Sequence, residues 1–135
     1  MAYWLLKTEP ESYSYDDLEK QGKTSWEGVR NFRAAKHLRT MQVGDLAFIY
    51  HTGKERAIIG VGEIATPAYP DPQAENARFV AVDVIPRYRL ARPVTLAEIK
   101  QNIKFSSWEL VNQPRLSVMP VKEEYWTSIE GLSQL

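Results

Sequence analysis

Ala57-Ile58-Ile59-Gly60-Val61-Gly62-Glu63-Ile64 is a stretch of β-strand character that contains two glycines. A glycine inside a strand marks a bulge or a tight bend, because it has no side chain to pack against neighbouring strands. Residues 46–51 form a second strand pattern, in which Tyr50 and His51 point to opposite faces. Together the two segments predict a sheet with the curvature that a small β-barrel needs.

Short helices and further strands flank this pair. Ser14 with Asp17, and Thr95 with Glu98, have the spacing of capping boxes. Asn31 is a favourable N-cap for the helix that follows it. We predict helices over residues 15–20, 32–41, 95–102 and 122–129, and further strands over residues 3–7, 79–85, 87–90 and 116–120. This pattern predicts one α+β domain over residues 1–135, with a barrel-like sheet and short peripheral helices.

The composition limits the kinds of site that the chain can contain. Its 135 residues include no cysteine and two histidines, so disulfides and thiol nucleophiles are excluded. A zinc site would depend on carboxylates, and Gly60-Val61-Gly62 lacks the third glycine and the helix of a dinucleotide-binding loop. We therefore expect neither a metal nor a cofactor. With no signal peptide and no apolar run of membrane-spanning length, we expect a cytoplasmic, bacterial-type monomer without a membrane partner.

The charges of the chain balance, with 17 basic and 17 acidic side chains. Attraction to nucleic acid through counterion release would therefore need a local patch. One basic run is present and consists of Arg30, Arg33, Lys36, His37 and Arg39. Charge alone favours a solvated helix face for this run, with its side chains projecting away from the core.

Residues 24–31, predicted as a loop, place Trp26 among polar and flexible neighbours. These neighbours include Ser25, Glu27, Gly28, Arg30 and Asn31. An extruded nucleobase is held by this combination of aromatic stacking and hydrogen bonds to its edge. The residues alone are equally compatible with packing of Trp26 in the core. Trp4 and Trp126 are predicted core residues, and Trp108 is assigned to neither role.

Catalysis has less support in the sequence than binding. Lys7, Glu9 and His51 could form the polar set of a small hydrolase acting on nucleic acid or a nucleotide. Ser25 lacks the surrounding sequence of a nucleophile elbow. We therefore assign no catalytic residue, and the hydrolase remains an alternative to a binding protein.

Ordered motifs extend along nearly the whole chain. They are Trp4-Leu5-Leu6-Lys7-Thr8-Glu9-Pro10, Trp26-Glu27-Gly28-Val29-Arg30-Asn31, Gly44-Asp45, Phe48-Ile49-Tyr50-His51, Tyr69-Pro70-Asp71-Pro72 and Gln113-Pro114-Arg115-Leu116-Ser117-Val118. In this order they resemble the motifs of EVE-domain proteins, which include the thymocyte nuclear protein 1 family.

This resemblance implies a PUA-like fold, a curved β-barrel with peripheral helices that is related to the YTH domains. It implies a reader that binds a flipped modified base in DNA, 5-methylcytosine or 5-hydroxymethylcytosine, without catalysis. An RNA-binding PUA-like module is the alternative that the resemblance leaves open. Because no nuclease or ATPase segment is fused to the domain, any cleavage or signalling would come from an effector protein partner.

The resemblance also implies which side chains bind. The base pocket would be formed by Trp26 as a stacking wall, Arg30 and Asn31 as polar contacts, Tyr50 and His51 as floor or rim, and Lys7 and Glu9 to complete it. Phosphate contacts beside the flipped nucleotide would come from Arg33, Lys36 and Arg115, which would set affinity and salt dependence rather than base choice.

Overall fold

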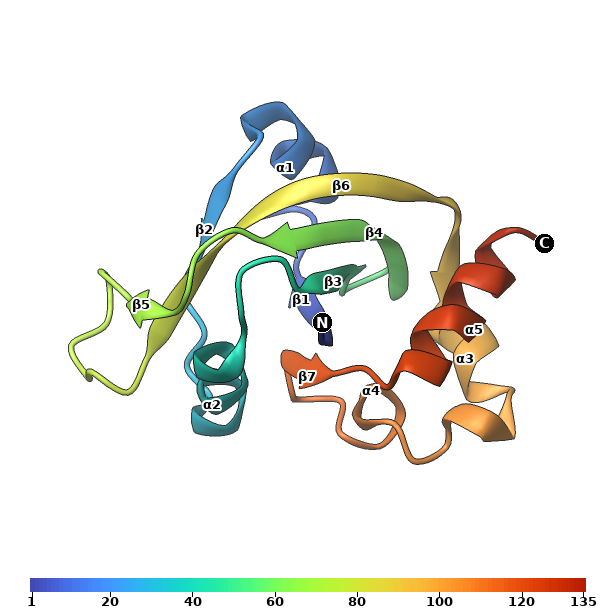
Figure 1. Ribbon diagram of the computed structural model, residues 1–135. Coiled ribbons are helices and arrows are strands. Elements are labelled where there is room, and N and C mark those ends of the chain that lie inside the picture. Colours follow the sequence, from blue (N-terminus) through green and yellow to red (C-terminus); the bar gives the residue numbers. More distant parts are fainter.

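A mixed β-sheet curls through the centre of the molecule, as the computed structural model of residues 1–135 shows (Figure 1). Its strand order is β2-β6-β4-β3-β1-β7, and β5 pairs separately with β6. Strands β1 and β3 are parallel, and all other pairs are antiparallel. The strands are β1 (Tyr3–Thr8), β2 (Thr24–Trp26), β3 (Leu46–His51), β4 (Ala57–Ile64), β5 (Tyr69–Pro70), β6 (Val80–Thr95) and β7 (Val118–Pro120).

The curvature comes from β4 and its partners, as the two glycines predict. The pairing register shifts beside both Gly60 and Gly62, which is where bulges bend the sheet. A Cβ atom at Gly60 would lie 2.7 Å from a ring carbon of Tyr15, so only glycine lets this side chain approach the strand. The predicted curved sheet is confirmed, and it forms a half-barrel.

Strand β6 is longer than predicted, because the segments predicted at residues 79–85 and 87–90 join in one continuous element, Val80–Thr95. Pro86 lies between the two predicted strands, and proline cannot donate a ladder hydrogen bond. It pairs with Gly62 at one of the register shifts, where a missing donor is tolerated. The single long strand therefore crosses the sheet and carries pairs with β2, β4 and β5.

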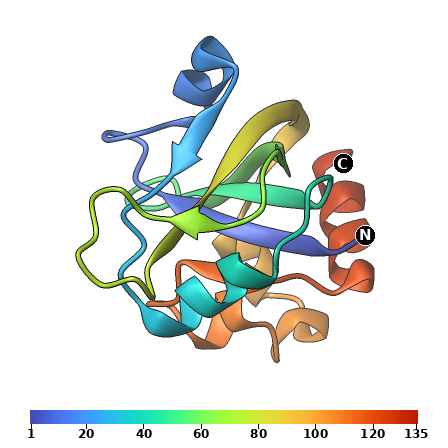
Figure 2. The same ribbon diagram turned by 60° about the vertical axis from the view of Figure 1, so that its left-hand side comes forward.

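Short helices cover the curled sheet, with α1 on one side and α3, α4 and α5 gathered on another (Figure 1; Figure 2). Both predicted capping boxes are present, at Ser14 and at Thr95. The helix predicted to end near residue 102 ends earlier, because Asn102 caps a 3₁₀ turn instead. The helices are α1 (Tyr15–Gln21), α2 (Phe32–Thr40), α3 (Leu96–Lys100), α4 (Glu109–Asn112) and α5 (Glu123–Ser133), with the 3₁₀ turn at Ile103–Phe105. Every helix falls short of the length and apolar character that crossing a membrane requires.

All four tryptophans are buried in the hydrophobic core. Trp126 stacks on Phe48, with ring centroids 3.7 Å apart, and this confirms its predicted inward orientation. Trp4 is buried, as predicted, and Trp108 is 1% exposed and therefore also a core residue. Trp26 differs from the other three because it also lines a cavity, which is described below.

His37 departs from the outward orientation predicted for the basic face of α2. It is half-buried and its ring lies 6.0 Å from the indole of Trp4. Burial lowers the pKa of His37, and the charge of Arg33 lowers it further. The cause is the packing of α2 against β7 and β6, which turns this position of the helix inward.

Asp45 joins the N-terminal strand to the turn before β3 through hydrogen bonds of its side chain, and its loss should destabilise the fold. Its buried carboxylate accepts hydrogen bonds from the Ala2 backbone N at 3.1 Å, Trp4 Nε1 at 2.9 Å and the Gln42 backbone N at 3.0 Å. Asp45→Ala should lower the free energy of unfolding by about 2–4 kcal/mol, because it strands these donors. Urea unfolding measures the loss. Asp45→Asn, which keeps one acceptor oxygen, should lose less, and equal midpoints for Asp45→Ala and wild type would contradict the argument.

Candidate nucleic-acid interface

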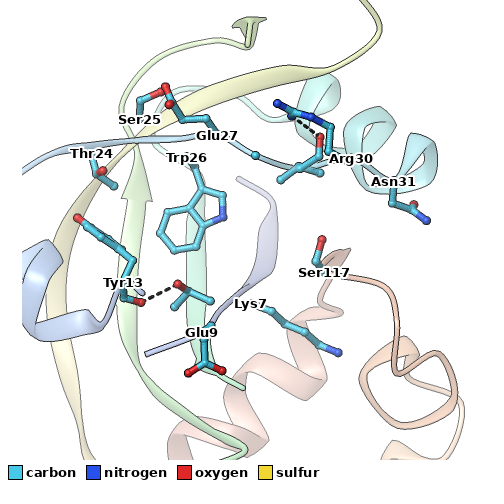
Figure 3. Close-up of a pocket in the computed structure, with 13 residues that line it drawn as sticks. Lys7, Glu9, Tyr13, Thr24, Ser25, Trp26, Glu27, Arg30, Asn31 and Ser117 are labelled. Carbon is cyan, nitrogen blue, oxygen red and sulfur yellow. Dashed lines mark hydrogen bonds between the residues drawn. The ribbon is translucent and has the colours of Figure 1, made fainter. Parts of the chain in front are cut away.

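A cavity of about 580 Å³ opens between the end of β1, the segment from β2 to α2, and the residue before β7 (Figure 3). Its size lies within the range of small-molecule sites, which runs from roughly 300 to 1,000 Å³. Its lining is mainly polar, with an aromatic wall, and consists of Lys7, Thr8, Glu9, Tyr13, Thr24, Ser25, Trp26, Glu27, Gly28, Val29, Arg30, Asn31 and Ser117.

Trp26 forms the aromatic wall of this cavity. It ends β2, the short edge strand that replaces part of the predicted loop, and pairs there with Val82 of β6. Alternating Thr, Ser and Trp suit a strand, but the long-range partner that creates it is not visible locally. The indole is 8% exposed and meets the ring of Tyr13 edge-on at 6.2 Å. Trp26 therefore packs in the core and also faces the cavity.

The carboxylate of Asp71 fixes the other wall. It is 3% exposed, and its Oδ2 accepts from the backbone N of Gly28 at 2.8 Å and from Arg30 Nη1 at 2.9 Å. Its Oδ1 accepts from the backbone N of Gln73 at 2.8 Å. Burial acts to raise the pKa of Asp71, but these three hydrogen bonds outweigh it, so the pKa lies below its usual range. Asp71 thus ties the loop between β5 and β6 to the segment that enters α2. The two segments lie side by side in Figure 2.

Arg30 and Asn31 are both partly committed to the protein. The guanidinium of Arg30 also donates to the Val29 carbonyl at 3.1 Å and lies 5.4 Å from the ring centroid of Phe79. Asn31 caps α2, and its Oδ1 accepts from the backbone N of Ala34 at 2.9 Å. The side-chain NH₂ of Asn31 and the remaining N–H groups of Arg30 are left for a ligand.

Lys7 and Glu9 lie across the cavity from Arg30 (Figure 3). Lys7 Nζ donates to the Pro114 carbonyl at 2.9 Å, and burial lowers the pKa of this amine. The Glu9 carboxylate accepts from the backbone N of Glu11 at 3.1 Å and from Thr52 Oγ1 at 3.3 Å. Both residues therefore line the cavity with Trp26, as the resemblance implies, and both are fixed by the protein.

Tyr50 and His51 do not line this cavity. They occupy opposite faces of β3, as predicted, but β3 is an inner strand and both side chains are buried. His51 Nε2 accepts from the backbone N of Tyr15 at 3.0 Å, and Nδ1 lies 3.1 Å from Glu55 Oε1. His51 therefore positions the start of α1 and does not share the cavity with Lys7 and Glu9, as a hydrolase site made of these three residues would require.

The three predicted phosphate-binding residues are all exposed, but they do not all line one hollow. Arg33 donates to the side chain of Gln113, and Arg33 and Arg115 line a second hollow of about 390 Å³. This hollow also includes Asn31, which borders the first cavity. Lys36 lies one helical turn further along α2, outside the hollow.

Comparison with known proteins identifies the family of this chain. The family model described as EVE domain matches residues 2–132. The chain belongs to the EVE-domain family. Human thymocyte nuclear protein 1 is 33% identical over 167 aligned positions, covering 98% of this chain and 74% of that protein.

Solved structures of relatives share the fold of this EVE domain. A protein from Agrobacterium tumefaciens has a TM-score of 0.96 at 33% identity, covering 100% of this chain and 94% of that one. Human thymocyte nuclear protein 1, in complex with 5-methylcytosine-containing DNA, has a TM-score of 0.92 at 31% identity, covering 100% of this chain and 99% of that one. The predicted α+β, PUA-like curved sheet is confirmed.

Sequence reasoning missed several residues of the EVE-domain cavity. Tyr13 and Ser117 line it from distant parts of the chain, and Asp71 organises it without lining it. Asp71 could have been found from its position between two prolines in Tyr69-Pro70-Asp71-Pro72, because such a segment is rigid and Asp71 is its one acidic residue. Tyr13 and Ser117 carried no local signal, since only the fold brings them beside Trp26.

Proposed function

We propose that this EVE domain is a non-catalytic reader that binds a flipped, modified cytosine of DNA in the cavity beside Trp26. The observation that carries the proposal is the cavity itself, where an indole wall faces free donors of Arg30 and Asn31. The complex of human thymocyte nuclear protein 1 with 5-methylcytosine-containing DNA supports DNA as the ligand.

The chemistry of the lining suits a cytosine base. Trp26 offers an apolar surface for stacking, which is worth ~1–3 kcal/mol per base. Glu9 and Glu27 provide carboxylate oxygens, the acceptors that suit the cytosine N4 amine. Arg30 and Asn31 provide donors for the O2 and N3 acceptors of the same base. Both 5-methylcytosine and 5-hydroxymethylcytosine keep this set of acceptors and donors.

Tryptophan fluorescence is the direct test of this proposal. The domain is titrated with matched duplexes that carry one unmodified cytosine, 5-methylcytosine or 5-hydroxymethylcytosine. Tighter binding and stronger quenching by a modified duplex are expected. Equal binding of all three duplexes would contradict base reading, and equal binding of a modified RNA would favour an RNA reader. Oligonucleotides recovered after prolonged incubation should be uncleaved and unaltered, whereas a released product would indicate a hydrolase.

Arg33 and Arg115 give a separate prediction about phosphate contacts. Arg115→Ala should weaken binding of modified and unmodified duplexes by the same factor, because a phosphate contact carries no base information. The slope of log affinity against log salt should become shallower by about 0.9 for the lost contact. Titrations at three salt concentrations measure both effects. Lys20→Ala, on the exposed end of α1, is the matched control, and a changed preference between duplexes would instead place Arg115 at the base.

A further inference from the structure

A third hollow, of about 330 Å³, lies on the other side of Lys7 from the base cavity. Three cationic side chains, Lys7, Arg56 and Lys100, line it together with the hydroxyl-bearing Tyr50 and Thr52. No carboxylate is among its nine lining residues. Glu9 borders the hollow, because Thr52 Oγ1 donates to its carboxylate at 3.3 Å, and the three cations outnumber this acid.

This hollow continues the basic surface beside the cavity. Pro114 borders both the hollow of Lys100 and the hollow of Arg115, and Lys7 borders both the hollow of Lys100 and the cavity. The cavity therefore adjoins a basic hollow at Asn31 and another at Lys7, and these two hollows meet at Pro114. A nucleic-acid strand whose base entered the cavity would have a basic hollow within reach at each of these two borders.

The backbone at Arg56 singles out this residue. Its φ of 43° makes it the one non-glycine residue of the chain with a positive φ. A side chain there is strained where glycine would not be, and such strain clusters at functional sites. The Arg56 carbonyl accepts from the backbone N of Leu96 at 2.8 Å, which fixes the turn against the start of α3. The side chain of Arg56 lines the hollow, and its Nε donates to the Gly53 carbonyl at 3.3 Å, so its terminal N–H groups are the donors left for a ligand.

Tyr50 adds a neutral donor beneath the cations. Lys7 Nζ lies 5.6 Å from the centroid of its ring. Burial raises the pKa of the Tyr50 hydroxyl, against the opposing effect of Arg56, so the hydroxyl stays protonated at neutral pH. Hydroxyl, ammonium and guanidinium donors around one hollow are the groups that bind phosphate oxygens. Tyr50, which the resemblance implies as floor or rim of the base pocket, therefore lines this neighbouring hollow instead.

We propose that the hollow of Lys7, Arg56 and Lys100 binds a phosphate of the nucleic-acid strand whose modified base occupies the cavity. The proposal rests on the proposed base-reading function and adds the course of the strand. The backbone passes from the hollow of Arg33 and Arg115, across the mouth of the cavity, to the hollow of Lys100.

Arg56→Gly and Lys100→Ala test the contact. Each should weaken binding of a modified duplex several-fold at low salt and make the salt slope shallower by about 0.9, with the preference for the modified base unchanged. Arg56→Gly should unfold at the same temperature as wild type or higher, because glycine relieves the positive φ. Lys20→Ala should bind as wild type does. Wild-type affinity in both test variants would overturn the proposal.

Neutral methylphosphonate linkages, placed one at a time along the modified strand, locate the phosphate. At one position the neutral linkage should weaken binding by the wild type. At that same position it should not lower the affinity of Lys100→Ala any further, because this variant already lacks the contact. If no position behaves in this way, the backbone contact is wrong. Selective binding by the wild type would then still uphold base reading. Conversely, salt-slope changes in a protein without base preference would uphold the phosphate site and contradict base reading.

A titration with inorganic phosphate tests whether the hollow binds free phosphate rather than a phosphate of the nucleic-acid backbone. Phosphate is titrated into the free domain against chloride of equal ionic strength, and binding is followed by NMR. Weak binding without saturation is expected if the hollow serves a strand. Saturable binding that Arg56→Gly abolishes, together with indifference to every methylphosphonate, would assign the hollow to free phosphate and overturn the backbone contact.

Discussion

Trp26→Ala is expected to reduce the affinity of the domain for a duplex carrying 5-methylcytosine by about 10- to 100-fold. The lost stacking surface faces the cavity between Tyr13 and Arg30. The loss should be much smaller for an unmodified duplex, which makes little use of the cavity. Fluorescence anisotropy of labelled duplexes measures both affinities without depending on tryptophan emission.

The control for this variant concerns folding, since Trp26 is 8% exposed and packs in the core. Removing so large a buried side chain costs about 3–5 kcal/mol of stability, so the folded fraction must be measured alongside binding. Trp26→Phe keeps an aromatic face and should retain most of the affinity and the preference for the modified base. A folded Trp26→Ala protein with wild-type affinity would refute the stacking role.

Asp71→Ala should produce the second large effect, although Asp71 does not line the cavity. It releases the backbone N of Gly28 and the guanidinium of Arg30 together, along with the backbone N of Gln73. A loss of about 2–3 kcal/mol in unfolding free energy is expected, because Arg30 is partly exposed and can be solvated again. Affinity for the modified duplex should fall about 10-fold or more as the wall loses its fixed geometry.

The charge on Asp71 can be separated from its shape with Asp71→Asn. The pKa of Asp71 in the folded protein is depressed below its unfolded value, which is about 3.9. The stabilisation is therefore present above that value and is lost as the pH falls through the folded pKa. Wild type should exceed Asp71→Asn by a constant margin between about pH 5 and pH 8, and the margin should shrink below about pH 4. A margin independent of pH would exclude the carboxylate charge as its source.

Two features of the fold could be predicted because their causes are local. The capping boxes at Ser14 and Thr95 depend on side chains three residues from the N-cap, and both formed as the spacing predicts. The bends at Gly60 and Gly62 follow from the missing side chains. The edge strand at Trp26 and the passage of β6 through Pro86 could not be predicted, because each depends on a partner distant in sequence.

The candidate site divides in the same way. Trp26, Gly28, Arg30 and Asn31 adjoin in sequence, so their shared cavity wall was accessible to sequence reasoning. The burial of His51 was not accessible, since alternation along a strand gives the two faces but not what covers each. The start of α1 covers the face of β3 on which His51 lies, and the backbone N of Tyr15 donates to His51 Nε2 there.

By itself, the sequence determined the α+β class, the curved sheet, the helix starts with a side-chain cap and the motifs that identify the EVE-domain family. These depend on spacing within a few residues or on the order of motifs. The tertiary structure alone decided that Asp71 fixes Arg30, that Tyr50 faces a separate hollow with Arg56, and that Lys100 joins them. Such assignments depend on which distant backbone segments hydrogen-bond to each other, and residue spacing carries no measure of that distance.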